Sequence, residues 1–215
     1  MFERWLEIPE QKSCLIIGPR RSGKTTLLKH RYASLPYATL DDLDHLDWAK
    51  RDPKGFIRSL GTQAIIDEIQ RLPILTVAVK YGIDNEAARF LMTGSSTIGL
   101  LDAAADTLAG RIEIFSLPPA CWGENEGRPT HSTLEEQVGF QRIKEANRKL
   151  SGASTFGQFP EVLIQDHDEE RYRVLVNYRN TYFTRDLMQL SNIENLDGLL
   201  AVFQHLSRSL GSHLE

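Results

Sequence analysis

Residues 18–25 read Gly18-Pro19-Arg20-Arg21-Ser22-Gly23-Lys24-Thr25. This octapeptide matches the pattern G-x-x-x-x-G-K-[ST], in which the glycines let the backbone curl around an anion and successive backbone N–H groups bind phosphate oxygens. The lysine of the pattern reaches the β- and γ-phosphates, and the hydroxyl after it binds Mg²⁺. We therefore predict a phosphate-binding loop in which Lys24 contacts phosphate, Thr25 is a metal ligand, and nucleotide contacts extend to Thr26.

The flanking residues supply the structural context that this pattern needs. The apolar run at 13–17 precedes the loop and predicts a buried parallel strand. After the loop, Leu28, Tyr32 and Leu35 recur at helical spacing, and Pro36 ends the helix. A strand, a glycine-containing loop and a helix in this order argue against a chance match.

Short apolar runs alternate with helical segments as far as residue 117. Further strands are predicted at 37–40, 64–66, 89–93 and 112–117. Helices are predicted at 100–109 and around a stripe formed by Ile74, Val77 and Tyr81. This alternation is typical of an α/β fold in which helices flank a parallel sheet.

The pattern changes after Trp122. Residues 123–130 are polar, contain Gly127 and Pro129, and predict a linker. Only helices are predicted beyond it, at 134–150, 168–190 and 196–210. We therefore expect a P-loop ATPase core at 1–126 and an all-helical region at 127–215.

Composition narrows the function classes. The net charge of −4 and the pI near 5.9 do not favour nucleic acid as a partner, although a local basic patch stays open. Two cysteines without a Cys/His cluster argue against a zinc site. No apolar run is long enough to span a bilayer, and the first residues do not resemble a signal peptide, so we expect a cytoplasmic protein with no membrane partner.

Two acids follow the predicted third strand. Asp67 at this point can contribute to the coordination shell of Mg²⁺, and Glu68 can orient and deprotonate an attacking water. The alternative is a helix N-terminus that favours acidic residues. A phosphate loop earlier in the same chain favours the catalytic interpretation, because two parts of a phosphoryl-transfer site then agree.

Two further positions have open interpretations. Ser95, in the stretch Thr93-Gly94-Ser95-Ser96, follows the fourth strand, where its hydroxyl could touch a γ-phosphate or the lytic water, or could belong to a plain turn. Arg111 precedes the fifth strand, where it could serve as an arginine finger or form a surface salt bridge.

Together these motifs resemble a large group of bacterial and archaeal AAA-superfamily ATPases. The resemblance runs from about residue 12 to residue 200 and is carried by 18–28, 40–42, 67–71, 93–96, 108–111, 117–119 with Glu124, 157–161, and 178–187. It implies an AAA+-like ATPase that uses ATP and Mg²⁺, with Ser95 or Thr93 as the sensor of γ-phosphate. It also implies that adenine is held by the N-terminal segment and the helical end.

Arg111 bears on assembly as well. The resemblance favours it as the arginine finger, and at its position just before the fifth strand, at a domain edge, it is poorly placed to reach its own γ-phosphate. We therefore expect Arg111 to act on a neighbouring subunit of a homo-oligomer. Typical members continue into a poorly characterised C-terminal domain, and we expect residues 127–215 to end before such a domain. Two other functions stay open, namely a nucleotide-binding scaffold with low turnover and a DNA-processing or defence ATPase.

Overall fold

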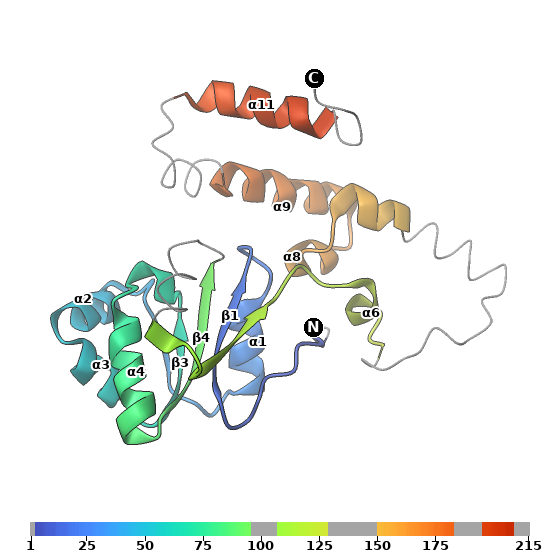
Figure 1. The fold of residues 1–215 in the computed structure, drawn as a ribbon. Helices are drawn as coiled ribbons and strands as arrows, with labels where there is room; N and C mark the ends of the chain where they lie inside the picture. The colour runs from blue at the N-terminus through green and yellow to red at the C-terminus, as the bar shows by residue number, and fades with distance from the viewer. Residues whose placement is uncertain (1–2, 96–106, 129–149, 183–194, 209–215) are drawn as a thin grey trace.

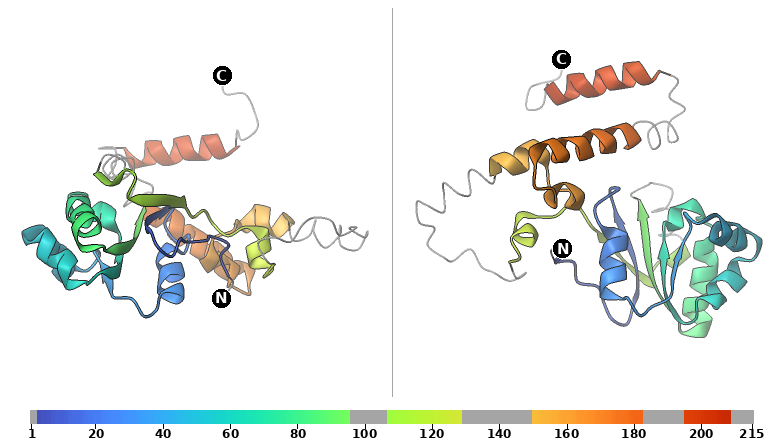
Figure 2. Two further views of the ribbon diagram at one scale, coloured as in Figure 1. Left: turned by 60° about the horizontal axis from the view of Figure 1, so that its bottom comes forward. Right: turned by 180° about the vertical axis from the view of Figure 1, so that it is seen from behind.

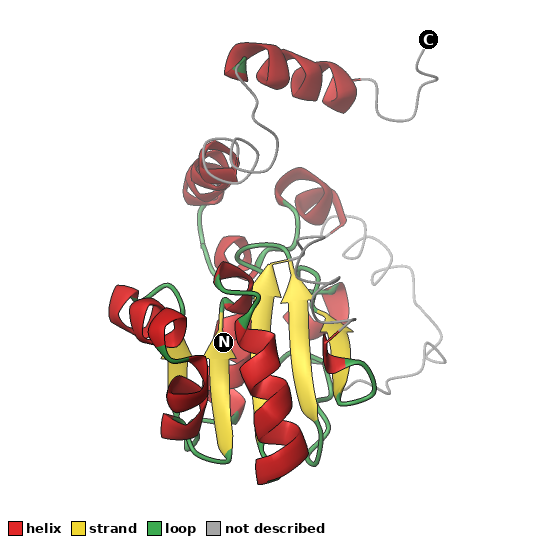
Figure 3. Cartoon of the chain, turned by 60° about the vertical axis from the view of Figure 1, so that its left-hand side comes forward, coloured by secondary structure: helices red, strands yellow, loops and turns green. Residues whose placement is uncertain are grey.

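The computed structural model describes residues 3–95, 107–128, 150–182 and 195–208. Its centre is a parallel sheet with helices packed around it (Figure 3). The sheet has five strands in the order β2-β3-β4-β1-β5. The strands are β1 (Ser13–Gly18), β2 (Tyr37–Thr39), β3 (Gln63–Asp67), β4 (Arg89–Ser95) and β5 (Ile112–Ser116). All five predicted strands are confirmed, and their common direction places every carboxyl end at one edge of the sheet.

Alternating side chains of β1 build two hydrophobic layers. Cys14 and Ile16 face helix α1 (Lys24–Arg31), where they pack with Leu28. Leu15 faces the opposite side and packs in a larger cluster with residues of three other helices. Because β1 is buried on both faces, its sequence is a continuous apolar run rather than an alternating one. Cys14 is a fully buried core side chain, and this burial raises the pKa of its thiol to about 12.

Three helices cover the second face: α2 (Leu43–Arg51), α3 (Pro53–Ser59) and α4 (Leu75–Glu86), the last preceded by the short 3₁₀ turn η1 (Ile69–Arg71). Aspartates begin the first two. The Asp42 side chain accepts hydrogen bonds from the N–H groups of Asp44 and His45, at 2.8 and 3.1 Å. The Asp52 carboxylate accepts from Gly55 N–H at 2.9 Å. Such N-caps satisfy backbone donors that a helix leaves unpaired.

Only helices are described in the C-terminal part of the chain. They are a helix that includes residues 150–156, the short α8 (Pro160–Leu163), α9 (Asp168–Thr181) and α11 (Leu196–Arg208). Helix α9 runs across the carboxyl edge of the sheet, and α11 lies on the side of α9 that faces away from the sheet (Figures 1 and 2). No helix in the described ranges is both long and apolar enough to cross a membrane.

The helix predicted around Ile74, Val77 and Tyr81 is confirmed as α4, although Ile74 and Val77 are 60% and 50% exposed and α4 buries Leu75 and Val79 instead. The predicted linker at 123–130 begins inside helix α6 (Trp122–Asn125). A Cβ on Gly123 would lie 2.2 Å from the Trp5 ring, so this glycine permits close packing and does not mark a flexible connection.

The remaining helix predictions fall partly outside the described residues. The predicted helix at 168–190 agrees with α9 as far as Thr181, and the one at 196–210 agrees with α11. The predicted helices at 134–150 and 100–109 lie almost wholly outside the described ranges, as do the last residues of the 168–190 segment.

Candidate functional site

The phosphate loop leaves the carboxyl end of β1 and enters α1 at Lys24. Lys24 is 5% exposed, and its Nζ donates hydrogen bonds to the carbonyl oxygens of Gly18 and Pro19, both at 2.9 Å. Burial lowers the pKa of Lys24, and the nearby Glu68 and Asp67 carboxylates act in the opposite direction. The ammonium is therefore held over the loop, with the two acids of β3 close by.

Asp67 is tied to the loop by a hydrogen bond. The Thr25 hydroxyl donates to Asp67 Oδ1 at 2.8 Å, although the two residues leave different strands. Strand β4 lies between β1 and β3, and at its end the Thr93 hydroxyl also donates to Asp67 Oδ1. On the other side of β3, the Tyr37 hydroxyl donates to Oδ2 at 2.8 Å. Three hydroxyls from three elements thus orient one buried carboxylate.

Glu68 follows Asp67 in a left-handed backbone conformation, with φ of 59°. Its N–H donates to Thr93 Oγ1 at 3.2 Å, and its carboxylate accepts a hydrogen bond from the Gln70 amide. A positive φ is uncommon for a residue other than glycine and costs free energy, so surrounding contacts must hold it. Here the conformation turns the Glu68 side chain toward a cavity that it shares with Lys24.

The donor set fits Mg²⁺ and phosphate. The Thr25 hydroxyl and the Asp67 carboxylate are oxygen ligands of the kind that Mg²⁺ prefers. Inside the loop, the Ser22 Oγ atom is fully buried and has no hydrogen-bond partner among the described residues. Because an unsatisfied buried hydroxyl is unfavourable, an anion bound by the loop would give this atom a partner.

The C-terminal end of helix α9 lies opposite the phosphate loop. A cavity of about 340 Å³ lies between the loop and the last turns of α9, where Tyr178, Thr181 and Tyr182 line it opposite Lys24 and Arg20. Arg21, at φ of 61°, also lines this cavity. Its Nη1 lies 2.8 Å from Glu161 Oε2 of α8, and its guanidinium lies 6.0 Å from the Tyr178 ring centroid.

A second and more apolar cavity, of about 950 Å³, adjoins the loop at Gly23 and Thr26. Its walls are the N-terminal segment (residues 3–8), helix α1, and helix α8 with the residue that follows it, and they include Arg4, Leu27 and Ile164. The loop therefore lies between two cavities, a polar cavity at Lys24 and a more apolar cavity beside the first turn of α1.

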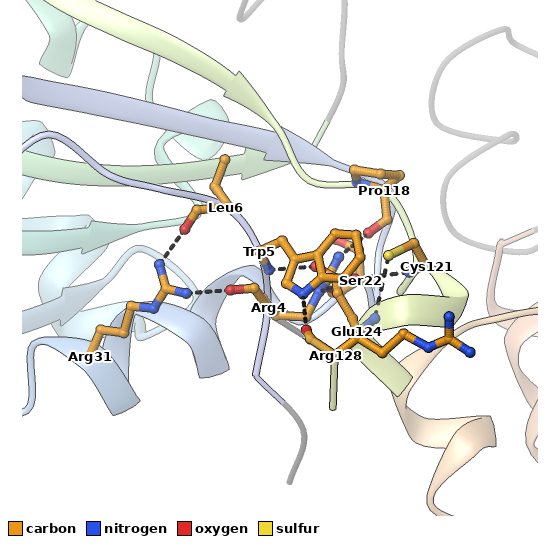
Figure 4. Close-up of polar contacts among 9 residues, drawn as sticks. All are labelled: Arg4, Trp5, Leu6, Ser22, Arg31, Pro118, Cys121, Glu124 and Arg128. Atoms are coloured by element: carbon orange, nitrogen blue, oxygen red, sulfur yellow. Dashed lines mark hydrogen bonds and ion pairs between the residues drawn. The ribbon is translucent and has the colours of Figure 1, made fainter. Parts of the chain in front are cut away.

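A buried ion pair attaches the N-terminal segment to helix α6. Arg4 Nε lies 3.0 Å from Glu124 Oε2, and the two residues are 7% and 5% exposed (Figure 4). Burial by itself raises the pKa of Glu124, but hydrogen bonds from Trp5 N–H, Cys121 N–H and Arg4 outweigh it and lower that pKa. Glu124 is therefore stabilised as a carboxylate at neutral pH.

Ser95 and Arg111 occupy opposite edges of the sheet. Ser95 pairs with Gly18 in the β1–β4 register, so its backbone lies beside the start of the loop. Arg111 precedes β5, whose Ile112 pairs with Ser13 at the start of β1. A strand of six residues spans about 17 Å between these levels. Arg111 instead forms an ion pair with Asp84 of α4, Nε to Oδ1 at 2.7 Å.

Sequence reasoning did not assign roles to several residues of this site. Tyr37 was part of a predicted strand and Gln70 of a stretch that carries the resemblance, but their contacts with the two acids depend on strand register and on the turn after β3. Glu124 appeared in the resemblance as a motif residue without a role. Arg4 had no local signal, because its partners lie 18 and 120 positions away.

Comparisons with known proteins agree with this architecture. A family profile described as AAA domain matches residues 10–125, and a profile described as a domain of unknown function matches residues 147–215. Two uncharacterized proteins, from Mycobacterium bovis and Mycobacterium tuberculosis, are each 37% identical over 106 residues. Those matches cover 48% of this chain and 24% of each relative, so the chain matches about a quarter of their length.

Two solved structures are similar at low sequence identity. A Walker-type ATPase of Pyrococcus abyssi gives a TM-score of 0.49 at 15% identity, over 83% of this chain and 70% of that one. The Orc1 protein of Aeropyrum pernix, solved in complex with DNA, gives 0.42 at 13% identity, over 97% of this chain and 75% of that one.

Proposed function

The chain belongs to the AAA domain family, and from that membership and the geometry of its site we propose that it binds ATP with Mg²⁺ and hydrolyses it. The observation that carries the proposal is the hydrogen bond between Thr25 and Asp67, with Lys24 and Glu68 beside it. These residues come from the loop and from the end of a strand two positions away in the sheet. Phosphoryl transfer to water requires a phosphate-binding cation, metal ligands and a group that positions the water, and these residues bring such groups together.

Each residue has one task in this proposal. The backbone of residues 18–25 and the Lys24 ammonium bind the phosphates, and the Ser22 hydroxyl gains a partner there. Thr25 and Asp67 would hold Mg²⁺, which neutralises charge on the phosphate oxygens. Thr93 fixes Asp67 and the backbone of Glu68. The Glu68 carboxylate, positioned by the left-handed turn, accepts the proton of the attacking water.

The apolar cavity supports a place for the base. It adjoins Gly23 and Thr26, and it is walled by the N-terminal segment and α8, the two parts from which the family resemblance implies an adenine contact. Leu27 and Ile164 offer apolar surface to a planar ring. In this proposal adenine enters this cavity and the γ-phosphate lies toward Lys24 and Glu68.

The test is phosphate release from ATP by the wild-type chain and by Glu68→Gln. Wild type should release phosphate with Mg²⁺ and stop when EDTA is added. Glu68→Gln should keep its affinity for ATP and hydrolyse it about 10²–10⁴-fold more slowly, because a positioned base contributes that much. Glu10→Gln, at an exposed position, is the matched control. Wild-type turnover by Glu68→Gln would place the base elsewhere, and stronger competition by GTP than by ATP would reject adenine as the base.

A further inference from the structure

The Arg4 guanidinium contacts the phosphate loop directly. Its Nη1 donates to the Ser22 carbonyl oxygen at 2.6 Å and its Nη2 donates to the Pro118 carbonyl at 2.7 Å, while Nε is paired with Glu124 (Figure 4). One planar group thus joins three segments that are far apart in the sequence, namely the N-terminal segment, the loop, and the chain that follows β5. Arginine suits this task because its donors form a rigid fork.

The contact with Ser22 has a consequence for the next N–H group. A peptide unit is planar and trans, so its C=O and N–H point in opposite directions. When Arg4 holds the Ser22 carbonyl, the N–H of Gly23 must point away from Arg4. The loop binds phosphate through such N–H groups, so the orientation of this one peptide contributes to anion binding.

Apart from the contact with Arg4, the backbone at Gly23 places little restraint on the orientation of the Ser22–Gly23 peptide. Gly23 has φ of +93°, and glycine adopts positive and negative φ with similar ease. Rotating the Ser22–Gly23 peptide changes only the ψ of Ser22 and the φ of Gly23, so little in the local backbone opposes the rotation. A charge-assisted hydrogen bond to the carbonyl is stronger than a neutral one and can select one orientation.

Arg4 is itself held in place from two sides. Glu124 binds its guanidinium and also accepts Trp5 N–H at 2.6 Å and Cys121 N–H at 2.8 Å. Arg31 of α1 donates to the carbonyl oxygens of Arg4 and Leu6, which fixes the backbone of the N-terminal segment against the helix that follows the loop. The buried guanidinium is therefore restrained by hydrogen bonds from several directions, as a positioning group requires.

We propose that Arg4, secured by Glu124, is a positioning residue that holds the Ser22–Gly23 peptide in the orientation that binds phosphate. The proposal rests on the proposed function, because it assumes that the loop binds a nucleotide. It assigns a phosphate-affinity role to a residue outside the loop motif. Arg4 also borders the apolar cavity, so its effect on phosphate must be separated from any contact with the base.

The experiment measures the affinity of the full chain for ATP and for inorganic tripolyphosphate, which has no base. Arg4→Lys keeps the charge and loses the fork, and it should weaken both ligands by the same factor, about tenfold, since a hydrogen bond to a charged group has that scale. Glu124→Gln should weaken both to a smaller degree. Arg128→Lys is the control, because Arg128 lies beside the same segment and its side chain pairs with Glu126.

The outcomes separate the alternatives. A lower melting temperature with unchanged affinities, measured well below that temperature, would mean that Arg4 is only structural and would overturn the proposal. Weaker ATP binding with unchanged tripolyphosphate binding would also overturn it, because the role would then be a base contact. Failure of the proposed function looks different, since Lys24→Ala would then bind both ligands as tightly as wild type.

Discussion

Asp67 is the residue on which the polar contacts of the site converge. Its two carboxylate oxygens accept hydrogen bonds from Thr25, Thr93 and Tyr37, and the residue is 5% exposed. The Tyr37 hydroxyl is the only one of these donors bound to Oδ2 in the described part of the chain. Burial and the bond to Asp67 raise the pKa of Tyr37, so its hydroxyl stays protonated and donates throughout the neutral range.

Tyr37→Phe should therefore disturb the metal more than the nucleotide. Without the donor on Oδ2, the carboxylate loses one constraint on its orientation, and partners of this kind are worth about 10–100-fold in metal affinity. We expect the Mg²⁺ concentration at half-maximal nucleotide binding to rise, while binding at saturating Mg²⁺ stays near wild type. Tyr172→Phe, at a residue 65% exposed on α9, is the control. An unchanged Mg²⁺ dependence would show that Tyr37 does not orient Asp67.

At this scale the sequence predicted the loop and the two acids because each lies within a short continuous motif. The partners of Asp67 come from three separate elements, and Thr93 reaches it only because β4 lies between β1 and β3. Strand order is a property of the folded sheet, so no local pattern around Thr93 or Tyr37 contained that information.

Among the elements, α2 shows how one residue can begin a helix. Asp42 accepts two N–H groups of the first turn and is fully exposed, and those hydrogen bonds lower the pKa of its carboxyl. Asp42→Ala should lower the urea concentration at the midpoint of unfolding, because the first turn of the helix loses its N-cap. Asp44→Ala changes an acid of the same turn that caps no described backbone donor, and it should lower that midpoint much less. Equal losses in the two variants would contradict the capping role.

Helix α4 shows that helical spacing alone does not identify the buried face of a helix. The residues Ile74, Val77 and Tyr81 have helical spacing, but so do Leu75, Ala78 and Gly82, which the helix buries. A Cβ on Gly82 would lie 3.1 Å from the Phe90 ring, so the glycine lets α4 approach β4 closely. The face that contains Ala78 and Gly82 packs against the sheet, and the large apolar residues Ile74 and Val77 at the same spacing do not reveal this.

For the whole molecule, the position of Arg111 bears on assembly. It lies at the amino edge of the sheet, about 17 Å of strand away from the level of its own loop, so a role in hydrolysis requires a second subunit. An arginine finger contributes about 10³–10⁵ in rate. Its ion pair with Asp84 would position it at such an interface.

The prediction is complementation between two inactive variants. Arg111→Ala and Glu68→Gln should each hydrolyse ATP poorly, and a mixture should regain activity because an intact Glu68 site can receive Arg111 from its neighbour. Arg58→Ala is the control, since Arg58 pairs with Glu86 of the same helix α4 at 2.8 Å. Normal turnover by Arg111→Ala at every protein concentration would make Arg111 a structural residue.

The segment that follows Trp122 shows that a polar, glycine-containing stretch need not be a linker. Gly123 and the polar residues after it predicted a linker, but Glu124 is buried against Arg4 from the opposite end of the core. Ala120 N–H also donates to the Gln158 carbonyl at 2.8 Å, which connects the core to the helical region. Contacts over such separations appear only once the chain is folded.

The central claim is that residues 18–25 bind the phosphates of ATP, and titration calorimetry of Mg²⁺–ATP into wild type and Lys24→Ala tests it most directly. Lys24 is buried at the loop, where its ammonium would face the phosphates in the proposed complex. Its removal should weaken binding by about ten- to a hundredfold or more, the scale of charge-assisted hydrogen bonds. Lys50→Ala, an exposed lysine of α2, should bind as wild type does. A folded Lys24→Ala chain with wild-type affinity for ATP would contradict the account.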